Sequence, residues 1–334
     1  MMQAQDFEGL YAIIATPAKA GSDRMGAVDT VDLDETEKVI NRLIRDGCSG
    51  LIVLGTTGEC ATLSDTDFRS FTACVIDSVQ RRVPTFVGTT ALGGHETARR
   101  LRHVSDLGAD GSLLGLPMWQ PLTTDMAIDY FAQVSELFPK LSIMAYANAR
   151  AFRFAFPVEF WAALAKAAPT VTSAKVSRAN GLLEQIEASQ GRIHFMPSDM
   201  VIAKFHALSP ETTTAAWATA AGMNPAPSIA LVKALANGDT DAQKSLSAAI
   251  AWANAPIEPL VANSELFASY NIQMEKTRIN AAGYSHCGPT RSPYNHFPAE
   301  LADAARECAA RWREVCRALE AVGVDQGPWL EMAQ

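Results

Sequence analysis

The sequence predicts a (β/α)8 TIM barrel with a C-terminal helical extension, and three observations support this α/β fold class. Across the first 220 residues, short apolar runs alternate with longer amphipathic stretches. Each run is mostly unbroken, as expected for a strand buried on both faces of a parallel sheet. After about residue 225 the strand-like runs stop and only helical patterns continue. We therefore assign residues 1–225 to the barrel and residues 226–334 to a helical C-terminal region.

The first two strand–helix units show how each element is assigned. The run 10–16 is strand-like, and 32–46 has apolar residues at helical spacing before the C-cap signal Gly47. The run 50–54 is the second strand, and Ser64 opens the next helix with a cap-like pair. The remaining strands are predicted at 84–88, 111–115, 142–146, 171–175, 193–197 and 213–217. The helices that follow them are predicted at 95–107, 124–138, 157–168, 181–189 and 201–208.

The extension is predicted to consist of helices alone. Its helical segments are 228–237, 239–254, 264–282 and 298–322. A doubly wound sheet is the alternative for the first part of the chain. That fold is disfavoured because no Gly-x-Gly-x-x-Gly follows the first strand and no Gly-Lys-Ser/Thr loop is present.

Composition and charge exclude several classes of protein. The chain has 28 Lys+Arg against 36 Asp+Glu, a net charge of −8, and its basic residues are scattered, so no positive stripe for nucleic acid is visible. No apolar run reaches the ~18–20 residues that a membrane span needs. The first eight residues lack the basic start of a secretory signal. We expect neither nucleic-acid nor membrane partners.

The cysteines and histidines indicate neither a disulfide framework nor a metal site. None of the six cysteines lies in a Cys-x-x-Cys pair, and the chain is long enough to bury a core without disulfides. Reduced thiols in a cytoplasmic protein are therefore expected. No two histidines have the spacing of a local metal pair, although distant ligands could still build a site.

The ends of the predicted strands provide the candidate catalytic residues, because barrel enzymes place their reactive groups there. Lys175 ends the sixth strand after an apolar run, so its ammonium enters the barrel mouth poorly solvated. Desolvation lowers the pKa of a lysine, and the free amine attacks a ketone to form a Schiff base. The alternative is a lysine that is paired with a nearby carboxylate or is solvated.

Two further strand ends carry groups that suit the same chemistry. Tyr146 ends the fifth strand, where a phenol can shuttle protons, with a core tyrosine as the alternative. Gly55-Thr56-Thr57-Gly58 follows the second strand and offers hydroxyl and backbone N–H donors to a carboxylate, although a plain turn fits it as well. Glu59 is a candidate base or a cap of the next helix. The conjunction of these features favours an active site more than any one alone.

Together these residues resemble the class I pyruvate aldolases of the dihydrodipicolinate synthase/N-acetylneuraminate lyase superfamily, and the resemblance covers nearly the whole chain. It implies that Lys175 forms the Schiff base and that Tyr146 shuttles protons. It also implies that Thr56 and Thr57 form the carboxylate-binding turn and that the protein is a homotetramer.

Departures from the best-known members point to one branch of this superfamily. The segment after strand five is Tyr146-Ala147-Asn148-Ala149-Arg150-Ala151, which lacks their proline and has Ala151 where the synthases place an arginine. Strand four ends in Leu116-Pro117-Met118-Trp119 instead of a tyrosine. With Tyr270-Asn271-Ile272 and Gly288-Pro289, these stretches resemble the hydratase-aldolases of polycyclic aromatic degradation. Those enzymes split an arylidene pyruvate into an aromatic aldehyde and pyruvate.

An aryl substrate needs a flat apolar wall and a few polar anchors. Trp119 is a candidate for the wall, and Asn148 and Asn271 are candidates for the anchors. Phe152 and Trp217 could also supply the wall, but core packing is at least as favoured for both.

The resemblance implies a small aromatic keto acid substrate, an ortho-hydroxy or ortho-carboxy benzalpyruvate. A Schiff base at Lys175 serves both hydration and aldol cleavage, so no metal or organic cofactor is expected. The alternatives are another Schiff-base pyruvate aldolase, a 2-keto-3-deoxy sugar acid dehydratase, a metal-dependent aldolase, and a barrel that binds a keto acid without catalysis. For Arg291 and Tyr294, in a Pro/Gly-rich loop, domain docking or a subunit contact is favoured.

Overall fold

The computed structural model describes residues 1–321 and 327–329 and contains one parallel sheet. Its eight strands follow the order β7-β6-β5-β4-β3-β2-β1-β8. The strands are β1 (Gly9–Ile14), β2 (Gly50–Val53), β3 (Thr85–Gly88), β4 (Gly111–Leu114), β5 (Ser142–Tyr146), β6 (Val171–Lys175), β7 (His194–Met196) and β8 (Ala215–Ala218). A parallel bridge between Ser198 and Trp217 joins the two end strands. The sheet therefore closes into the predicted barrel, and the doubly wound alternative is wrong.

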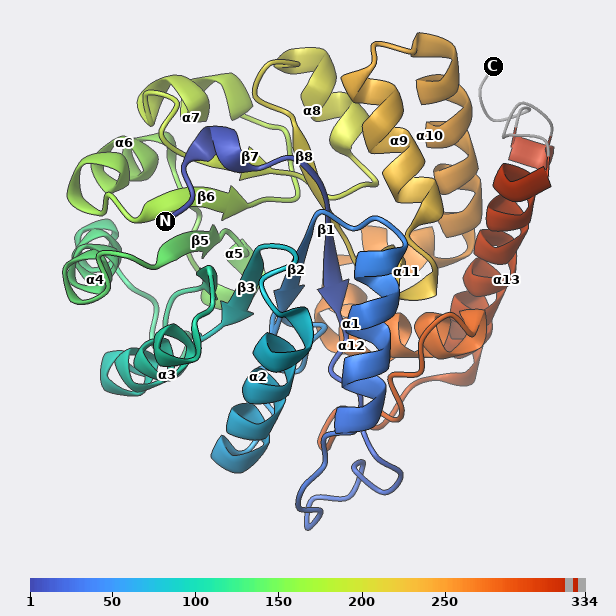
Figure 1. The fold of residues 1–334 in the computed structure, drawn as a ribbon, viewed down its shortest axis with the longest axis horizontal. Helices are drawn as coiled ribbons and strands as arrows, with labels where there is room; N and C mark the ends of the chain where they lie inside the picture. Colours follow the sequence, from blue (N-terminus) through green and yellow to red (C-terminus); the bar gives the residue numbers. More distant parts are fainter. Residues whose placement is uncertain (322–326, 330–334) are drawn as a thin grey trace.

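Helices follow the strands around the barrel (Figure 1). They are α1 (Leu33–Arg45), α2 (Asp65–Val79), α3 (Gly94–Leu107), α4 (Thr124–Leu137), α5 (Ala149–Phe152), α6 (Val158–Ala167), α7 (Leu182–Ala188) and α8 (Ile202–Leu208). Polar caps begin several of them, because a side-chain oxygen satisfies a free N–H of the first turn. Ser64, for example, accepts a hydrogen bond from the Asp67 backbone N–H at 3.1 Å. The Asp67 carboxylate does not complete that cap, since it binds the backbone N–H and the hydroxyl of Thr30 instead.

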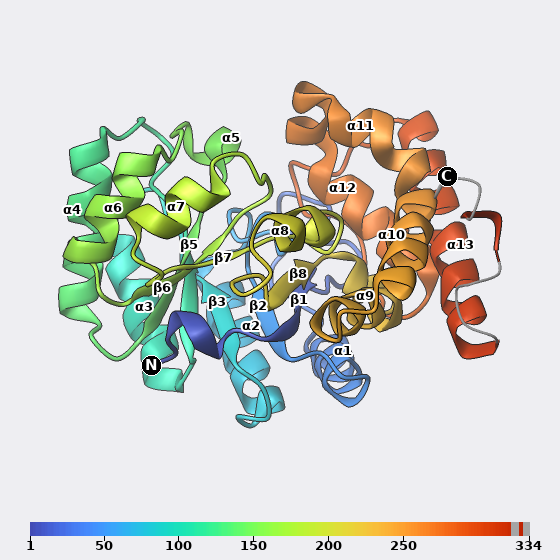
Figure 2. The same cartoon turned by 90° about the horizontal axis from the view of Figure 1, so that it is seen from above.

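The C-terminal region is helical, as predicted, within the described residues. It contains α9 (Ala226–Ala236), α10 (Thr240–Asn254), α11 (Glu258–Ala262), α12 (Ser264–Ala282) and α13 (Ala299–Ala321). Figure 1 shows α9, α10 and α13 on one side of the barrel, and Figure 2 shows α11 and α12 on that same side. The expected final helix residue, 322, and residues 323–326 and 330–334 of the predicted region lie outside the described residues.

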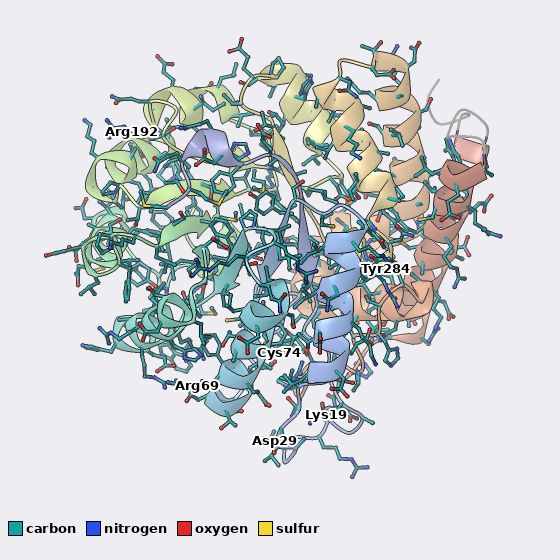
Figure 3. All side chains as sticks on the ribbon, in the orientation of Figure 1. Lys19, Asp29, Arg69, Cys74, Arg192 and Tyr284 are labelled. Atoms are coloured by element: carbon teal, nitrogen blue, oxygen red, sulfur yellow. The ribbon has the colours of Figure 1, made fainter. Side chains whose placement is uncertain are left out.

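The apolar core continues from the barrel into these helices. One buried cluster contains Leu51 of β2, Val232 of α9 and Trp312 of α13. Tyr284, which follows α12, donates its hydroxyl proton to Asp46 at the end of α1, and Figure 3 shows it beside that helix. The helical region is thus packed on the β1–β2 side of the barrel, and the division at residue 225 stays a prediction. No helix in the described part of the chain is long and apolar enough to cross a membrane.

Candidate active site

Strand register brings the two predicted catalytic residues side by side. Tyr146 pairs with Lys175 where β5 meets β6, and both stand at the carboxyl ends of their strands. Trp217 of β8 also reaches this point, because its indole Nε1 donates to the Val176 carbonyl at 3.0 Å. The barrel mouth therefore gathers an amine, a phenol and an indole from three strands.

Lys175 is buried, with 9% of its surface exposed, and aromatic rings are its near neighbours. Its Nζ lies 3.3 Å from the Trp217 ring centroid and 4.8 Å from that of Tyr146. No carboxylate of the described residues forms an ion pair with it. Burial lowers the pKa of Lys175 to about 7, and the more distant Glu275 carboxylate opposes that shift. Near neutral pH a large fraction of this amine is therefore free and nucleophilic.

Tyr146 is held by polar groups on both sides of its hydroxyl. The Asn148 amide donates to the phenol oxygen at 3.3 Å, and Thr56 Oγ1 lies 3.0 Å from the same oxygen. Either hydroxyl can donate in the Thr56–Tyr146 hydrogen bond, so the pair can pass a proton in either direction. Phe152 packs edge-to-face on the Tyr146 ring, with centroids 5.3 Å apart. The phenol thus lies between Lys175 and the predicted carboxylate-binding turn.

The turn after β2 is tightly folded. A side chain at Gly58 would place its Cβ 2.6 Å from the Leu54 nitrogen, so only glycine fits there. Thr16 donates its hydroxyl proton to the Gly58 carbonyl at 2.7 Å, and the Glu59 N–H donates to the Thr56 carbonyl. Thr57 is buried and Thr56 is half-buried beside Tyr146. The predicted Thr56 and Thr57 pair therefore lies at the same mouth as Tyr146 and Lys175.

Glu59 is neither a free base nor a helix cap. Its carboxylate accepts from Lys276 Nζ at 2.9 Å and from Arg291 Nη1 and backbone N. Arg291 also donates to the Pro17 carbonyl and to Thr30. We call Glu59, Lys276 and Arg291 the buried clamp. It anchors the loop of Arg291 to the barrel, in agreement with the docking role favoured for that residue, and it fixes the residue next to the Gly-Thr-Thr-Gly turn.

One face of α12 is directed towards the mouth. Phe267, Asn271 and Glu275 follow one another at i, i+4 spacing and so share that face. The Asn271 side-chain oxygen is buried and has no hydrogen-bond partner among the described residues. Glu275 is buried in an ion pair with Arg278, at 2.7 Å, and it acts on Lys175 through space. Asn271 thus shares a helix face with a residue that acts on Lys175, and its role as an anchor stays a prediction.

The remaining candidates lie in different surroundings. Trp119 is 78% exposed in the single chain, and its carbonyl accepts from Arg153. Asn148 uses its amide oxygen to cap α5, by accepting from the Ala151 N–H. Phe152 is buried against Gly115, whose Cβ would lie 2.0 Å from the ring, so Phe152 is a core residue behind Tyr146. Of Phe152 and Trp217, Trp217 is the one whose ring contacts the Lys175 amine.

Sequence reasoning did not connect Glu59 with Lys276 and Arg291, or Glu275 with Arg278. Glu275, Lys276 and Arg278 lie close together on α12, in a stretch that also fits a solvated helix face. Asp199, three residues after β7, is a further buried carboxyl group near the strand ends. Burial raises its pKa to about 6, against the effect of the hydrogen bond from Ser228. No group of three or more His, Cys, Asp or Glu side chains among the described residues is arranged to hold a metal ion.

Known proteins share both the sequence and the fold. Residues 7–308 match the model of the dihydrodipicolinate synthetase family. The chain is 37% identical to a trans-O-hydroxybenzylidenepyruvate hydratase-aldolase from Sphingobium xenophagum, across 96% of this chain and 98% of that protein. It is 34% identical to a trans-2'-carboxybenzalpyruvate hydratase-aldolase from Nocardioides sp. (strain KP7), across 92% and 93%. A solved structure described as "PhdJ bound to substrate intermediate" superposes with a TM-score of 0.91 and 31% identity, across 95% and 98%. The chain belongs to the dihydrodipicolinate synthetase family.

Proposed function

We propose that this protein is a hydratase-aldolase of polycyclic aromatic degradation. It converts a trans-arylidene pyruvate and water into an aromatic aldehyde and pyruvate. The observation that carries the proposal is the buried Lys175 amine. No carboxylate among the residues that the structure describes forms an ion pair with it, and it lies beside the Thr56–Tyr146 hydrogen bond. The full-length relatives with hydratase-aldolase names support the same reaction.

The first half of the reaction forms the Schiff base and hydrates the alkene. Thr56 and Thr57 bind the substrate carboxylate, and the Lys175 amine attacks the C2 ketone and expels its oxygen as water. The resulting iminium is conjugated with the alkene, so C4 becomes electrophilic. Water adds at C4 and C3 takes up a proton. Tyr146 handles these protons, directly or through a water molecule.

The second half cleaves the carbon–carbon bond. The C4 hydroxyl loses its proton, the C3–C4 bond breaks, and the aldehyde leaves while the bonding electrons pass to the iminium and form an enamine. Protonation at C3 restores the iminium, and water hydrolyses it to pyruvate and free Lys175. The imine is the electron sink in both halves, so the proposed mechanism uses no metal or organic cofactor.

The aryl group is proposed to lie between Trp217, Asn271 and the loop of Trp119. Trp119 is highly exposed in one chain, which suits a residue that closes over a substrate or a neighbouring subunit. We further propose a homotetramer in the cytoplasm, on the strength of the family resemblance and the reduced cysteines. Light scattering coupled to gel filtration tests the tetramer, because a monomeric mass would contradict it.

Borohydride trapping tests the Schiff base. Pyruvate with borohydride should add a stable adduct to the peptide that contains Lys175, whereas borohydride alone should add none. An adduct on another lysine, or no adduct, would contradict the mechanism. Loss of the long-wavelength absorbance of a benzalpyruvate measures turnover, and a higher kcat/KM for a 2-keto-3-deoxy sugar acid would favour the dehydratase alternative.

A further inference from the structure

Two arginines flank the reacting residues at the barrel mouth. Arg150 lies on α5, four residues after Tyr146, and Arg178 lies three residues after Lys175. Because Tyr146 and Lys175 are register partners on β5 and β6, the two loops that carry these arginines begin side by side. Both side chains are exposed to solvent. They are therefore available to a bound molecule at the rim of the site.

These two guanidinium groups repel each other, and no counter-charge pairs with either in the described part of the chain. Partial burial lowers the pKa of Arg150, the cation of Arg178 lowers it further, and Tyr146 has a small opposite effect. Neither arginine forms an ion pair with a carboxylate in residues 1–321 or 327–329. An anion bound between them relieves this repulsion and gains charge-assisted hydrogen bonds.

Arg150 is held in place without being neutralised. Its guanidinium carbon lies 4.4 Å from the Phe267 ring centroid, and Nη1 donates to the Ser264 carbonyl at 3.4 Å. Figure 2 shows α5 and α11 at the same edge of the molecule, with α12 behind α11. An aromatic face and a carbonyl orient a guanidinium but leave its charge free for a carboxylate. Arg153 is different, because it donates to the Met118 and Trp119 carbonyls and anchors the β4 loop.

The same face of α12 supplies an adjustable polar group. Asn271 is one turn beyond Phe267, and its side-chain oxygen has no partner among the described residues. The oxygen and nitrogen of an amide exchange places by rotation, so Asn271 can also turn its NH2 group to an anion. The Phe267 ring and the Asn271 amide thus share one face of α12, and the Arg150 guanidinium contacts that face at Phe267.

We propose that Arg150 and Arg178 form a subsite for an anionic substituent on the substrate's ring, and that they make an ortho-carboxy arylidene pyruvate the preferred substrate over an ortho-hydroxy one. The inference rests on the proposed function and specifies the substrate class of that site. The net charge of −8 repels such a dianion at long range. The paired cations at the rim offset that repulsion where the substrate enters.

The test uses Arg150→Gln, Arg178→Gln and the double variant, with Arg192→Gln as the matched control. Arg192 lies two residues before β7 and so lies at the amino ends of the strands, opposite the mouth. In Figure 3 it is remote from Lys19 and Asp29, which follow the carboxyl end of β1. Each protein is assayed with ortho-carboxy-, ortho-hydroxy- and unsubstituted benzalpyruvate. Pyruvate trapping with borohydride shows that each variant retains a functional Lys175.

Wild-type protein should have the highest kcat/KM for the ortho-carboxy substrate. Each single change should lower that value about 10–100-fold, the usual effect of one hydrogen bond to a charged group, and leave the other two substrates within about threefold. Arg192→Gln should change none of the three. Equal losses on all substrates, no loss on the carboxy substrate, or a wild-type preference for the hydroxy substrate would overturn the subsite. Failure to cleave any benzalpyruvate would instead overturn the proposed function.

Discussion

Two buried lysines at the barrel mouth have opposite surroundings. Lys276, 2% exposed, donates to Glu59 at 2.9 Å and to the Pro289 and Thr16 carbonyls at 2.6 and 3.3 Å. Three acceptors need three N–H donors, which only the ammonium form supplies. Lys175 has the rings of Trp217 and Tyr146 as neighbours, and among the described residues no acceptor forms a hydrogen bond with its amine.

The difference teaches that burial alone does not make a lysine nucleophilic. Burial lowers the pKa of both amines. The Glu59 carboxylate opposes that effect because it contacts Lys276 directly. Glu275 is ion-paired with Arg278 and acts on Lys175 only from a distance. Lys276 is a fixed structural cation. Lys175 has a lowered pKa, so near neutral pH much of it is the neutral amine. The predictions below test this contrast.

The largest effect is expected from Lys175→Met. Removing the only amine that can form the imine should lower kcat by at least about 10⁴-fold, as losses of covalent nucleophiles do. The measurement is the decay of benzalpyruvate absorbance, together with borohydride trapping. Retained turnover would mean that another group performs the chemistry and that the contrast between the two lysines is irrelevant to function.

Tyr146→Phe should come next. It removes the phenol hydroxyl that is hydrogen-bonded to Thr56, and kcat should fall about 10²–10⁴-fold because a positioned acid–base group is lost. Imine formation with pyruvate should survive, since the Lys175 amine is untouched. Unchanged kcat would remove Tyr146 from proton transfer, and loss of trapping would assign it to imine formation instead.

Lys276→Met should act on stability. The change removes the Lys276 donor from the Pro289 carbonyl and leaves Arg291 as the donor to both Glu59 and the Thr16 carbonyl, so the free energy of unfolding should fall by roughly 3 kcal/mol. Urea denaturation measures the loss, and Lys233→Met, at an exposed position on α9, is the matched control with almost no effect. In the Glu59→Gln/Lys276→Met double variant the loss should be smaller than the sum of the single losses. Additive losses would show that the clamp is not a coupled unit.

The pH dependence of the rate should follow the free amine. With the pKa of Lys175 at about 7, kcat/KM should rise about tenfold per unit below that pH and level off above it. Lys276 should not contribute to this pH dependence, because its ammonium form is held by three hydrogen-bond acceptors. A limb near pH 10 would show that Lys175 is as well solvated as an ordinary lysine.

The smallest effect is a gain in stability from Lys175→Met. Because the folded-state pKa lies below that of the unfolded chain, the unfolded chain binds more protons between about pH 7 and pH 10. The contribution of this group to the free energy of unfolding therefore falls as the pH decreases towards about 7 and rises as the pH increases towards about 10. The variant should melt a few degrees higher than wild type at pH 7 and lack this rise, opposite in sign to Lys276→Met. A lower melting temperature would contradict the view that Lys175 costs stability.

The fold class was predictable from local patterns, and the family match and the closed sheet confirm it. Apolar runs at strand length set the eight strands, with errors confined to their ends: β1 ends at Ile14 instead of Thr16, and β8 begins at Ala215 instead of Thr213. The short helices α5 and α11 were missed, because four or five residues are too few to show a helical period.

The site was predictable only where chemistry coincided with a strand end. Tyr146 and Lys175 meet because parallel strands in register bring their ends together. The partners of Glu59 are 217 and 232 residues away along the chain, and no local pattern reports such contacts. The exposure of Trp119 also depends on how its loop packs, which the neighbouring residues Pro117 and Met118 do not reveal. The catalytic and binding roles of the named residues stay predictions.

The clamp also sets the order in which the protein can mature on the ribosome. Glu59 is synthesised 232 residues before Arg291, an interval of about 10–50 s at a usual speed of ~5–20 residues per second. Lys276 follows Glu59 by 217 residues, so the carboxylate gains its first buried counter-charge after all eight strands have been made and its second only with Arg291. A nascent barrel with all eight strands therefore still lacks both cations that neutralise the carboxylate next to the Gly-Thr-Thr-Gly turn. The clamp is completed only when one of the last segments of the chain has been made.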